Sequence, residues 1–467
     1  MATRARRGLP GWVAALTAAC VAYASHGGTP DQLFGVIGLL LINSCLIAWL
    51  AVDEAFESLK ISQVLITAIA LGAIGMLTQP LLEDDHFRYL WDGYITATTG
   101  QPFAHAPSHY FVDAGVPGVM QDALNGINNP DIPTIYGPVL QALFALCYWM
   151  APAALWPLKL VLLGAQVAVV LLLRYAGVRP RWLMLLTLHP LLIKESAMTA
   201  HPDILIGAAL LAAVLAWRRQ HEGLAAILAA TAVAMKFSAV AALLFFCINR
   251  HGRLSARGCL AMLLTLGMLY APVLLPASGG GEGLGVAAFA GQWTFNPLLF
   301  KWVAAALGNT VARVTCIGLF ALAWLILAGQ WIAKLRGAGR KGLNRTATAT
   351  ATATAMTATA TTTAMANAMP PSLPSPPLVG VFIAMLLLSP VVNPWYWLWI
   401  LPLAMLPFSP VAWAAATASL LAYSHVLVQV MAGSSIATYA VPLWATGLQS
   451  VAIVATFGFV CYRRKRI

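Results

Sequence analysis

The chain has 467 residues, of which 60% are hydrophobic and only 9% are charged, and its mean hydropathy is +0.79. A soluble domain has about 45–50% apolar and about 25% charged residues, so this composition excludes an ordinary soluble protein. The net charge is +12, but the basic residues lie in short segments between apolar runs. That distribution is typical of cytoplasmic membrane loops, and we expect no nucleic-acid partner.

The apolar runs predict an all-α, polytopic integral membrane protein. A spanning helix needs ~20 mostly apolar residues, and runs of this kind predict about 11–13 transmembrane helices here. The first three spans are expected at about 10–26, 33–52 and 61–82. With Arg4, Arg6 and Arg7 on the cytoplasmic side, the third span ends outside. The segment 83–135 is therefore expected to be an extracytoplasmic loop, and its length favours a functional role.

The densest charge lies at the start of this loop, between Glu83 and Gly93. If the chain is helical from Asp85 onward, the spacing i, i+3, i+4, i+7 places four side chains on one face: Asp85, Arg88, Tyr89 and Asp92. Two adjacent carboxylates, Asp84 and Asp85, can supply a general base or bind a divalent cation such as Mg²⁺ or Mn²⁺. The alternative is a surface Asp–Arg pair with a helix N-cap.

The opposite face of this expected helix is apolar. It would carry Phe87, Leu90, Trp91 and Tyr94. Such a face suits a helix that lies in the membrane interface. The sequence therefore predicts an amphipathic helix at the membrane surface, with its charged side available for chemistry.

Further candidate binding residues follow along the chain. Tyr136 and Gln141 could hydrogen-bond a sugar, although Tyr136 could equally be an interfacial anchor. His201 and Asp203 lie at an expected outer helix start, where an aspartate is also favoured by the helix dipole. The adjacent Lys194 and Glu195 are expected to pair with each other.

Two other candidates lie in strongly apolar surroundings. Lys236 needs a partner or an anion, or its ammonium could reach the membrane surface along its own stem. Trp395 and Tyr396 belong to an aromatic group that would form an interfacial belt, stack on a carbohydrate or line a lipid groove.

Breaks in the apolar pattern predict the rest of the topology. The region 136–175 is expected to break between Ala151 and Pro157 into a short piece and one span. The run 223–248 is expected to break near Lys236 into a re-entrant pair, since this keeps both flanking basic segments cytoplasmic. The predicted organisation is a transmembrane catalytic core at 1–336, a flexible Thr/Ala- and Pro-rich cytoplasmic linker at 337–377 and C-terminal transmembrane helices at 378–467.

The order of these motifs resembles that of a known enzyme group. An acidic pair with Arg-Tyr and Trp-Asp-Gly comes first, followed by Gly100-Gln101-Pro102-Phe103 and Ile135-Tyr136-Gly137-Pro138. A His-x-Asp step at 201–203, a Met-Lys-Phe step at 235–237 and Asn393-Pro394-Trp395-Tyr396 complete the series. The chain resembles bacterial glycosyltransferases of the GT-C fold that use polyprenyl-phosphate sugars, especially the mannosyltransferase type.

The resemblance implies an enzyme of the bacterial inner membrane with its active face extracytoplasmic. It would transfer a sugar, most simply mannose, from a polyprenyl-phosphate donor to a glycan, lipid or protein acceptor with inversion. By position, Asp85 would be the general base, with Asp84 as the alternative. Arg88, and also His201 or Lys236, would stabilise the departing phosphate.

Two other functions are compatible with a polytopic membrane protein. One is a transporter or flippase of lipid-linked sugars, but paired internal repeats are absent from the sequence and the charge lies outside the spans. The other is a ligase of lipid-linked sugars, which would carry its long outer loop late in the chain. The glycosyltransferase is therefore the expected function.

Overall fold

The computed structural model describes residues 12–13, 15–23, 29–50, 59–274, 285, 291, 293–353, 374–426 and 440–465. Within these residues the regular elements are helices, apart from two isolated bridges that pair Ile248 with Leu254 and Phe295 with Val391. The all-α prediction is confirmed for this part of the chain.

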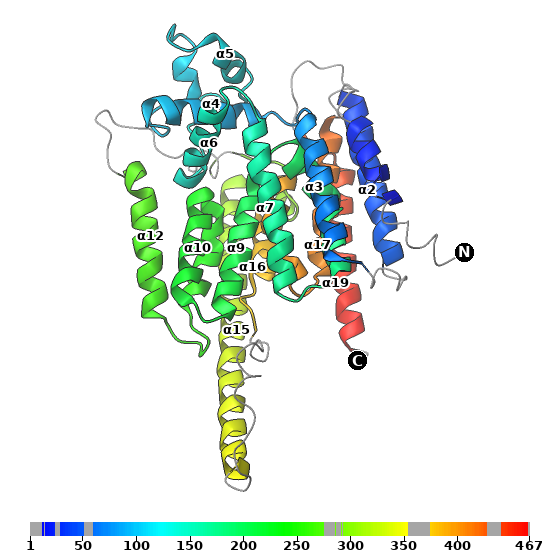
Figure 1. Ribbon diagram of the computed structural model, residues 1–467, viewed down its shortest axis with the longest axis vertical. Helices are drawn as coiled ribbons and strands as arrows, with labels where there is room; N and C mark the ends of the chain where they lie inside the picture. Colours follow the sequence, from blue (N-terminus) through cyan, green and yellow to red (C-terminus); the bar gives the residue numbers. More distant parts are fainter. Residues whose placement is uncertain are drawn as a thin grey trace.

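Most long helices lie side by side in a bundle (Figure 1). It contains α2 (Thr29–Leu50), α3 (Ile61–Leu77), α7 (Trp156–Tyr175), α9 (Asp203–Arg218), α10 (Glu222–Met235), α12 (Ala256–Leu274), α16 (Leu378–Leu388), α17 (Pro410–Ser419) and α19 (Leu443–Lys465). Two helices, α4 (Asp85–Thr99) and α5 (Gly118–Asn125), gather at one end, and α15 (Asn309–Ala353) extends beyond the other.

Shorter elements connect these helices. They are η2 (Pro107–Tyr110), α6 (Pro138–Met150), α8 (Pro180–Thr187), η3 (Leu192–Met198), η4 (Phe237–Ala239), α11 (Val240–Leu243), η5 (Leu244–Cys247), α14 (Phe300–Leu307), η6 (Pro394–Trp399), η7 (Leu403–Met405) and η8 (Leu420–Ser424). The element η3 is a π-helix, a form that is frequent at functional sites.

Three of the described helical segments are long and apolar enough to cross a membrane: Trp156–Tyr175, Asn309–Ala338 and Leu443–Tyr462. A fourth candidate is the pair η3 and α9, which is bent by 111°. Other apolar helices have 10–17 residues. The larger number of spans that the sequence suggests therefore stays a prediction.

Small side chains allow the helices around α10 to pack closely. The buried face of α10 is almost entirely alanine and contacts both α9 and α12. Its members are Ala225, Ala226, Ala229, Ala230, Ala232, Val233 and Ala234. Small residues let helix backbones approach without a large side chain between them, so this face holds α9 and α10 side by side.

Both predicted helix breaks are present. The first separates α6, which ends at Met150, from α7, which begins at Trp156. The second lies at Lys236, between α10 and η4. Beyond it the chain turns back: Ser255 hydrogen-bonds Glu222 at the start of α10, and the Trp217 indole donates to the Ile248 carbonyl. The break and the reversal of the chain are confirmed, with Lys236 at the turning point; the re-entrant placement of this pair in a membrane stays a prediction.

The predicted linker begins inside a helix. α15 continues through residues 337–353, residues 354–373 lie outside the described part, and Leu378 begins α16. The flexibility and the domain division proposed for this region stay predictions.

The helix expected after Asp84 is confirmed as α4, and part of its apolar face is covered by protein. Trp91 is 2% exposed and packs with Ile95, Met120 and Leu124 in a small core of its own. Phe87, Leu90 and Tyr94 are partly buried and pack against this core. The segment that follows α4 therefore folds back over this face, and the placement of α4 at a membrane surface stays a prediction.

Candidate active site

Five segments that are distant in the sequence meet near the N-terminus of α4. They contribute Asp85 from α4, Tyr136 from the loop before α6, His201 and Asp203 from the start of α9, Lys236 from the re-entrant turn, and Trp395 and Tyr396 from η6. The backbone fixes part of this meeting, since the amide of Gly137 donates to the carbonyl of Met235 at 2.9 Å. Most of the predicted site residues therefore form one cluster.

Asp85 is the partly accessible carboxylate of this cluster, with a side chain that is 21% exposed. The Tyr136 hydroxyl donates to Asp85 Oδ2 at 3.4 Å, and His201 Nδ1 lies 4.0 Å from the same oxygen. Burial, and next the negative charge of Asp84, raises the pKa of the Asp85 carboxyl to about 6. A carboxylate with this pKa is ionised at neutral pH and is a stronger base than an ordinary aspartate.

Asp84 has a different environment. Its Oδ1 accepts a hydrogen bond from the Asn128 side-chain amide at 2.5 Å, and its side chain makes no capping bond to α4. Asp84 thereby joins the start of α4 to the loop near Asn128. Of the two candidate bases, Asp85 has the geometry that fits the role, while Asp84 raises the pKa of its neighbour.

Arg88 binds backbone carbonyls and not a carboxylate. Its Nη2 donates to the carbonyls of Asn129 at 3.2 Å and Ile132 at 3.0 Å. Its Nη1 is buried and has no hydrogen-bond partner among the described residues. The alternative of an Asp–Arg surface pair with an N-cap is therefore wrong, and one guanidinium donor remains for an anion.

His201 is fully buried between aromatic rings. Its ring stacks on Trp395 with centroids 3.9 Å apart and an interplanar angle of 10°. Its Nδ1 lies 2.7 Å from the Tyr89 hydroxyl, and its Nε2 lies 3.6 Å from Glu195 Oε2. His201 thus connects α4 to the π-helix η3.

Lys236 forms a buried ion pair beside a cavity. Its Nζ lies 2.9 Å from Asp203 Oδ1, which also accepts from the Trp399 indole at 2.6 Å. The ammonium lies 4.4 Å from the ring centroid of Tyr396. The cavity has a volume of about 170 Å³ and is lined by Lys236, Ser238, Tyr396 and Trp399 together with apolar residues such as Met385 and Leu386.

Asp92 and Gln141 lie apart from this cavity. The Oδ2 of Asp92 accepts from Thr134 Oγ1 at 2.6 Å and from the Gln141 amide at 2.9 Å. Asp92 is 4% exposed and Gln141 is 1% exposed. These two candidate substrate-binding residues instead join α4, α6 and the loop at Thr134.

The neighbouring Gly93 completes this contact between α4 and α6. A Cβ built on Gly93 would lie 2.5 Å from the carbonyl oxygen of Phe144. The Trp-Asp-Gly motif thus positions α4. Trp91 fills the small core, Asp92 accepts a hydrogen bond from Gln141 on α6, and Gly93 allows α4 and α6 to cross closely.

A family model described as alpha-(1->6)-mannopyranosyltransferase, N-terminal domain, matches residues 7–251, which is more than half of the chain. The chain belongs to this mannosyltransferase family. It is therefore a glycosyltransferase, as the motif order predicts. No curated protein and no solved structure matches it.

The matched range contains the first part of the candidate site. Asp85, Tyr136, His201 and Lys236 lie within residues 7–251, whereas Trp395 and Tyr396 lie beyond them. The two parts meet where His201 stacks on Trp395 and where Lys236 faces Tyr396. The C-terminal segment thereby completes the cluster that the matched part begins.

Sequence reasoning missed a second buried group in this mannosyltransferase. The predicted Lys194–Glu195 pair is confirmed at 3.2 Å, but Glu195 Oε1 also accepts from the Tyr423 hydroxyl at 2.7 Å. Burial raises the pKa of the nearby Glu83 well above its usual value. Tyr423 lies 228 residues after Glu195, and no local pattern in the sequence signals this contact.

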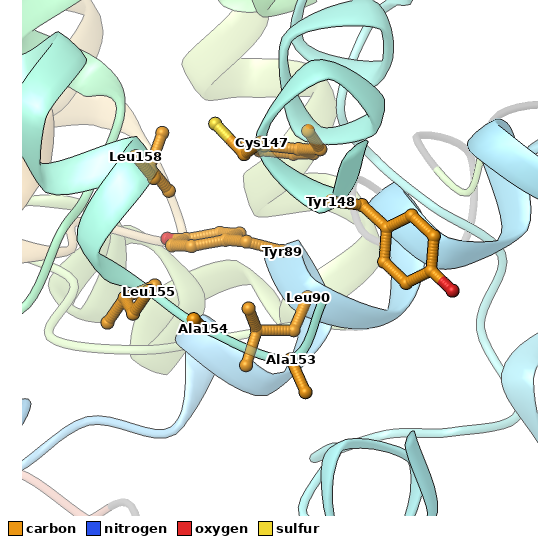
Figure 2. Close-up of a pocket in the computed structure, with 9 residues that line it drawn as sticks. Tyr89, Leu90, Cys147, Tyr148, Ala153, Ala154, Leu155 and Leu158 are labelled. Carbon is orange, nitrogen blue, oxygen red and sulfur yellow. The ribbon is translucent and has the colours of Figure 1, made fainter. Parts of the chain in front are cut away.

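Tyr89 is enclosed on the side away from Tyr136. Figure 2 shows its ring with Cys147 of α6 and Leu158 of α7 on one side, and with Leu90 of α4 and Leu155, the residue before α7, on the other. The cavity behind it has a volume of about 10 Å³, which is barely enough for one water molecule. The Tyr89 hydroxyl is therefore held at His201 by close packing.

Metal binding through Asp84 and Asp85 stays open. In the part of the chain that the structure describes, no group of three or more His, Cys, Asp or Glu side chains is arranged to hold a metal ion. Asp84 and Asp85 have partners in Asn128 and Tyr136. Binding Mg²⁺ or Mn²⁺ through both carboxylates would require these contacts to rearrange.

Proposed function

We propose that this enzyme transfers a mannosyl group from a polyprenyl-phosphate donor to the 6-hydroxyl of an extracytoplasmic mannose-containing acceptor, with inversion. The family description supports an α-(1→6) product. An inverting reaction that gives an α product requires a β-linked donor. The observation that carries the proposal is Asp85, a partly exposed carboxylate with a pKa raised to about 6, beside the cationic side chains of Lys236 and Arg88.

The reaction needs one base and a stabilised leaving group. Asp85 accepts the proton of the acceptor hydroxyl while the hydroxyl oxygen attacks the anomeric carbon. The bond from that carbon to the phosphate oxygen breaks, and its electron pair stays on the oxygen. The donor is a phosphodiester with one negative charge, and the product polyprenyl phosphate carries a second. Cations at the phosphate therefore stabilise the transition state more than the ground state.

Lys236 and Arg88 supply these cations in the proposed complex. Lys236 lines the cavity of about 170 Å³, whose other lining residues are mostly apolar or aromatic and include Met385 and Leu386. This arrangement suits a phosphate next to the first isoprene units of a lipid. The buried, unpartnered Nη1 of Arg88 offers a further donor.

The distribution of basic residues supports a multi-pass protein of the bacterial inner membrane. The long helix α15 extends from the end of the bundle opposite α4 (Figure 1) and carries Lys334 and Arg336. Arg336 donates to the carbonyl of Gly252, so the basic segment 250–257 lies at the same end. The positive-inside rule makes that end cytoplasmic and the α4 end extracytoplasmic.

Mannosyl transfer by the purified enzyme tests this function. Radiolabelled mannose would be supplied either on polyprenyl phosphate or on a nucleotide, together with a mannose oligosaccharide acceptor. We expect transfer only from the lipid donor, and linkage analysis should give α-(1→6). Transfer from the nucleotide sugar alone would overturn the proposed donor. Parallel reactions with a chelator test the metal requirement.

The transporter or flippase alternative predicts a different result. Membership in a mannosyltransferase family favours the enzyme. A flippase would move the labelled lipid across a vesicle membrane without forming a glycosidic bond. Formation of an oligosaccharide product in detergent, where no second compartment exists, would exclude this alternative as the explanation of the activity.

A further inference from the structure

Glu195 and His201 are linked twice within one short segment. The amide of His201 donates to the carbonyl of Glu195 at 2.8 Å, and the Glu195 carboxylate faces the ring, with Oε2 3.6 Å from Nε2. Both side chains are fully buried. Between them Ala200 has a φ of +65°, a left-handed conformation that an alanine rarely adopts. With Ala200 in this strained conformation, the backbone places the ring of His201 next to the carboxylate of Glu195.

The surroundings of the ring decide which nitrogen carries the proton. Nε2 has no hydrogen-bond partner among the described residues, and the group that faces it is the carboxylate of Glu195. An unprotonated Nε2 would direct a lone pair at that negative charge. Burial of the ring disfavours a second proton, which would charge it, and the ammonium groups of Lys194 and Lys236 add to this effect. A neutral ring with its proton on Nε2 satisfies both conditions.

We propose that Glu195 is a positioning residue that holds His201 in the Nε2–H form, so that Nδ1 accepts the proton of the Tyr89 hydroxyl. This inference rests on the proposed function, because it concerns the strength of Asp85 as a base. Tyr89 lies one helical turn after Asp85 on α4, and His201 Nδ1 lies 4.0 Å from Asp85 Oδ2. With Nδ1 as an acceptor, the hydroxyl proton of Tyr89 points at His201 and away from Asp85.

The opposite form of the ring would weaken the base. A proton on Nδ1 would face both the Tyr89 oxygen and Asp85 Oδ2. The Tyr89 hydroxyl would then donate either to the Tyr136 hydroxyl, which itself donates to Asp85, or to the carboxylate of Asp85 one turn away. Additional donors to a carboxylate stabilise its ionised form and lower its proton affinity. Glu195 would therefore affect the chemical step and leave donor binding unchanged.

Glu195→Gln is the direct variant. Tyr423 contacts the Oε1 position and the Lys194 ammonium contacts the Oε2 position, so the amide oxygen has a donor at either place, and in both orientations the negative charge that faces His201 Nε2 is lost. Without that charge the form of the ring with its proton on Nδ1 is no longer disfavoured and becomes populated. We expect kcat to fall roughly 10- to 100-fold, part of the ~10²–10⁴ that a general base contributes, with the KM for the lipid donor unchanged.

A matched pair at His201 tests the same idea without disturbing the Lys194–Glu195 pair. An asparagine places its amide near the position of Nδ1, and a glutamine places it near Nε2. Asn can accept from Tyr89 without help from Glu195, so we expect His201→Asn to retain at least about tenfold more kcat than His201→Gln. Equal activity of the two variants would overturn the proposal.

The double variant separates positioning from general support of the fold. If Glu195 acts through His201, adding Glu195→Gln to His201→Asn should reduce kcat by less than about twofold, since coupled residues are not additive. A further loss as large as in the wild-type background would show that Glu195 acts independently and would overturn the inference. Thermal unfolding of each variant in detergent identifies those that fail to fold.

A spectroscopic measurement decides the proton position without any assay. The ring nitrogens of ¹⁵N-histidine-labelled enzyme would be assigned to His201 by difference from His201→Asn. We expect a protonated Nε2 and an unprotonated Nδ1 in the wild type, and a measurable fraction with the proton on Nδ1 in Glu195→Gln; a proton on Nδ1 in the wild type would refute the proposal. If the wild type transferred no mannose, the proposed function would be wrong. The spectrum would still show which ring nitrogen of His201 carries the proton, and so would test the role of Glu195 separately.

Discussion

Lys236 and Asp203, which are 33 residues apart, form an ion pair of 2.9 Å at the point where the re-entrant segment turns. The Trp399 indole binds the same carboxylate oxygen, while the other oxygen, Asp203 Oδ2, has no partner among the described residues. The pair is nearly inaccessible, with side chains 9% and 1% exposed. It therefore joins the re-entrant turn to α9 and holds an ammonium group at the wall of the cavity.

Breaking this pair should affect stability and activity differently. Lys236→Met leaves the Asp203 carboxylate buried without its cation, a change that costs roughly 3–5 kcal/mol when one partner of a buried pair is removed. We expect a lower midpoint of thermal unfolding in detergent. The double variant with Asp203→Asn removes both charges and should recover most of the stability.

Activity should not recover with stability in that double variant. Lys236 is proposed to bind the donor phosphate, so kcat/KM for the lipid donor should remain reduced by at least about 10-fold, the effect of ~1.4 kcal/mol of lost transition-state stabilisation. Steady-state rates at several donor concentrations measure this. Full activity in the double variant would show that Lys236 has only a structural role.

Replacing the proposed base should abolish transfer without affecting folding. Asp85→Asn is nearly isosteric and removes the proton acceptor, so we expect kcat to fall by ~10²–10⁴, with unchanged expression and thermal midpoint. The matched control is Asp122→Asn, the same change at an exposed position on α5 in the same end of the molecule. If Asp84→Asn were inactive and Asp85→Asn active, Asp84 would be the base.

The raised pKa of Asp85 predicts the pH dependence of the reaction. The base must be ionised, so kcat/KM should rise with pH through about 6 and level off above it. At one pH unit below the pKa about one tenth of the base is ionised, which gives roughly a tenfold loss. Asp84→Asn removes the neighbouring negative charge that helps to raise this pKa. The acidic limb of the kcat/KM profile of this variant should therefore shift to lower pH. A profile whose acidic limb does not shift would show that Asp84 does not act on the titrating group.

Local pattern was sufficient to predict several of these features. The charge and spacing after Asp84 predicted α4, and the basic residues on both sides of 223–248 predicted the reversal at Lys236. Each depends on a rule that acts over a few turns of helix or on the sign of flanking charges. The candidate site was found for the same reason, since charged groups in an apolar chain are conspicuous.

Features that depend on tertiary packing were not accessible in this way. The apolar face of α4 looks interfacial in sequence, and only the return of α5 shows that part of it is covered by protein. Asp92 has the same spacing as Asp85 on α4, yet Thr134 and Gln141 bind it inside the contact with α6. The contact between Glu195 and Tyr423 spans 228 residues, and no periodicity relates two such positions.

The close crossing of α4 and α6 makes Gly93 sensitive to substitution. A Cβ at this position would lie 2.5 Å from the carbonyl oxygen of Phe144, so the backbones would have to separate in Gly93→Ala. Overpacking of this kind costs typically about 1–3 kcal/mol, and the separation would also move Asp85 relative to His201. We expect a lower thermal midpoint together with a reduced kcat.

The matched control is Gly164→Ala, an exposed helical glycine on α7 whose added Cβ meets nothing within 4 Å. That variant should be as stable as the wild type or slightly more stable, because alanine is the better helix former. An equal loss in both variants would attribute the effect to glycine replacement in general and not to the contact between α4 and α6.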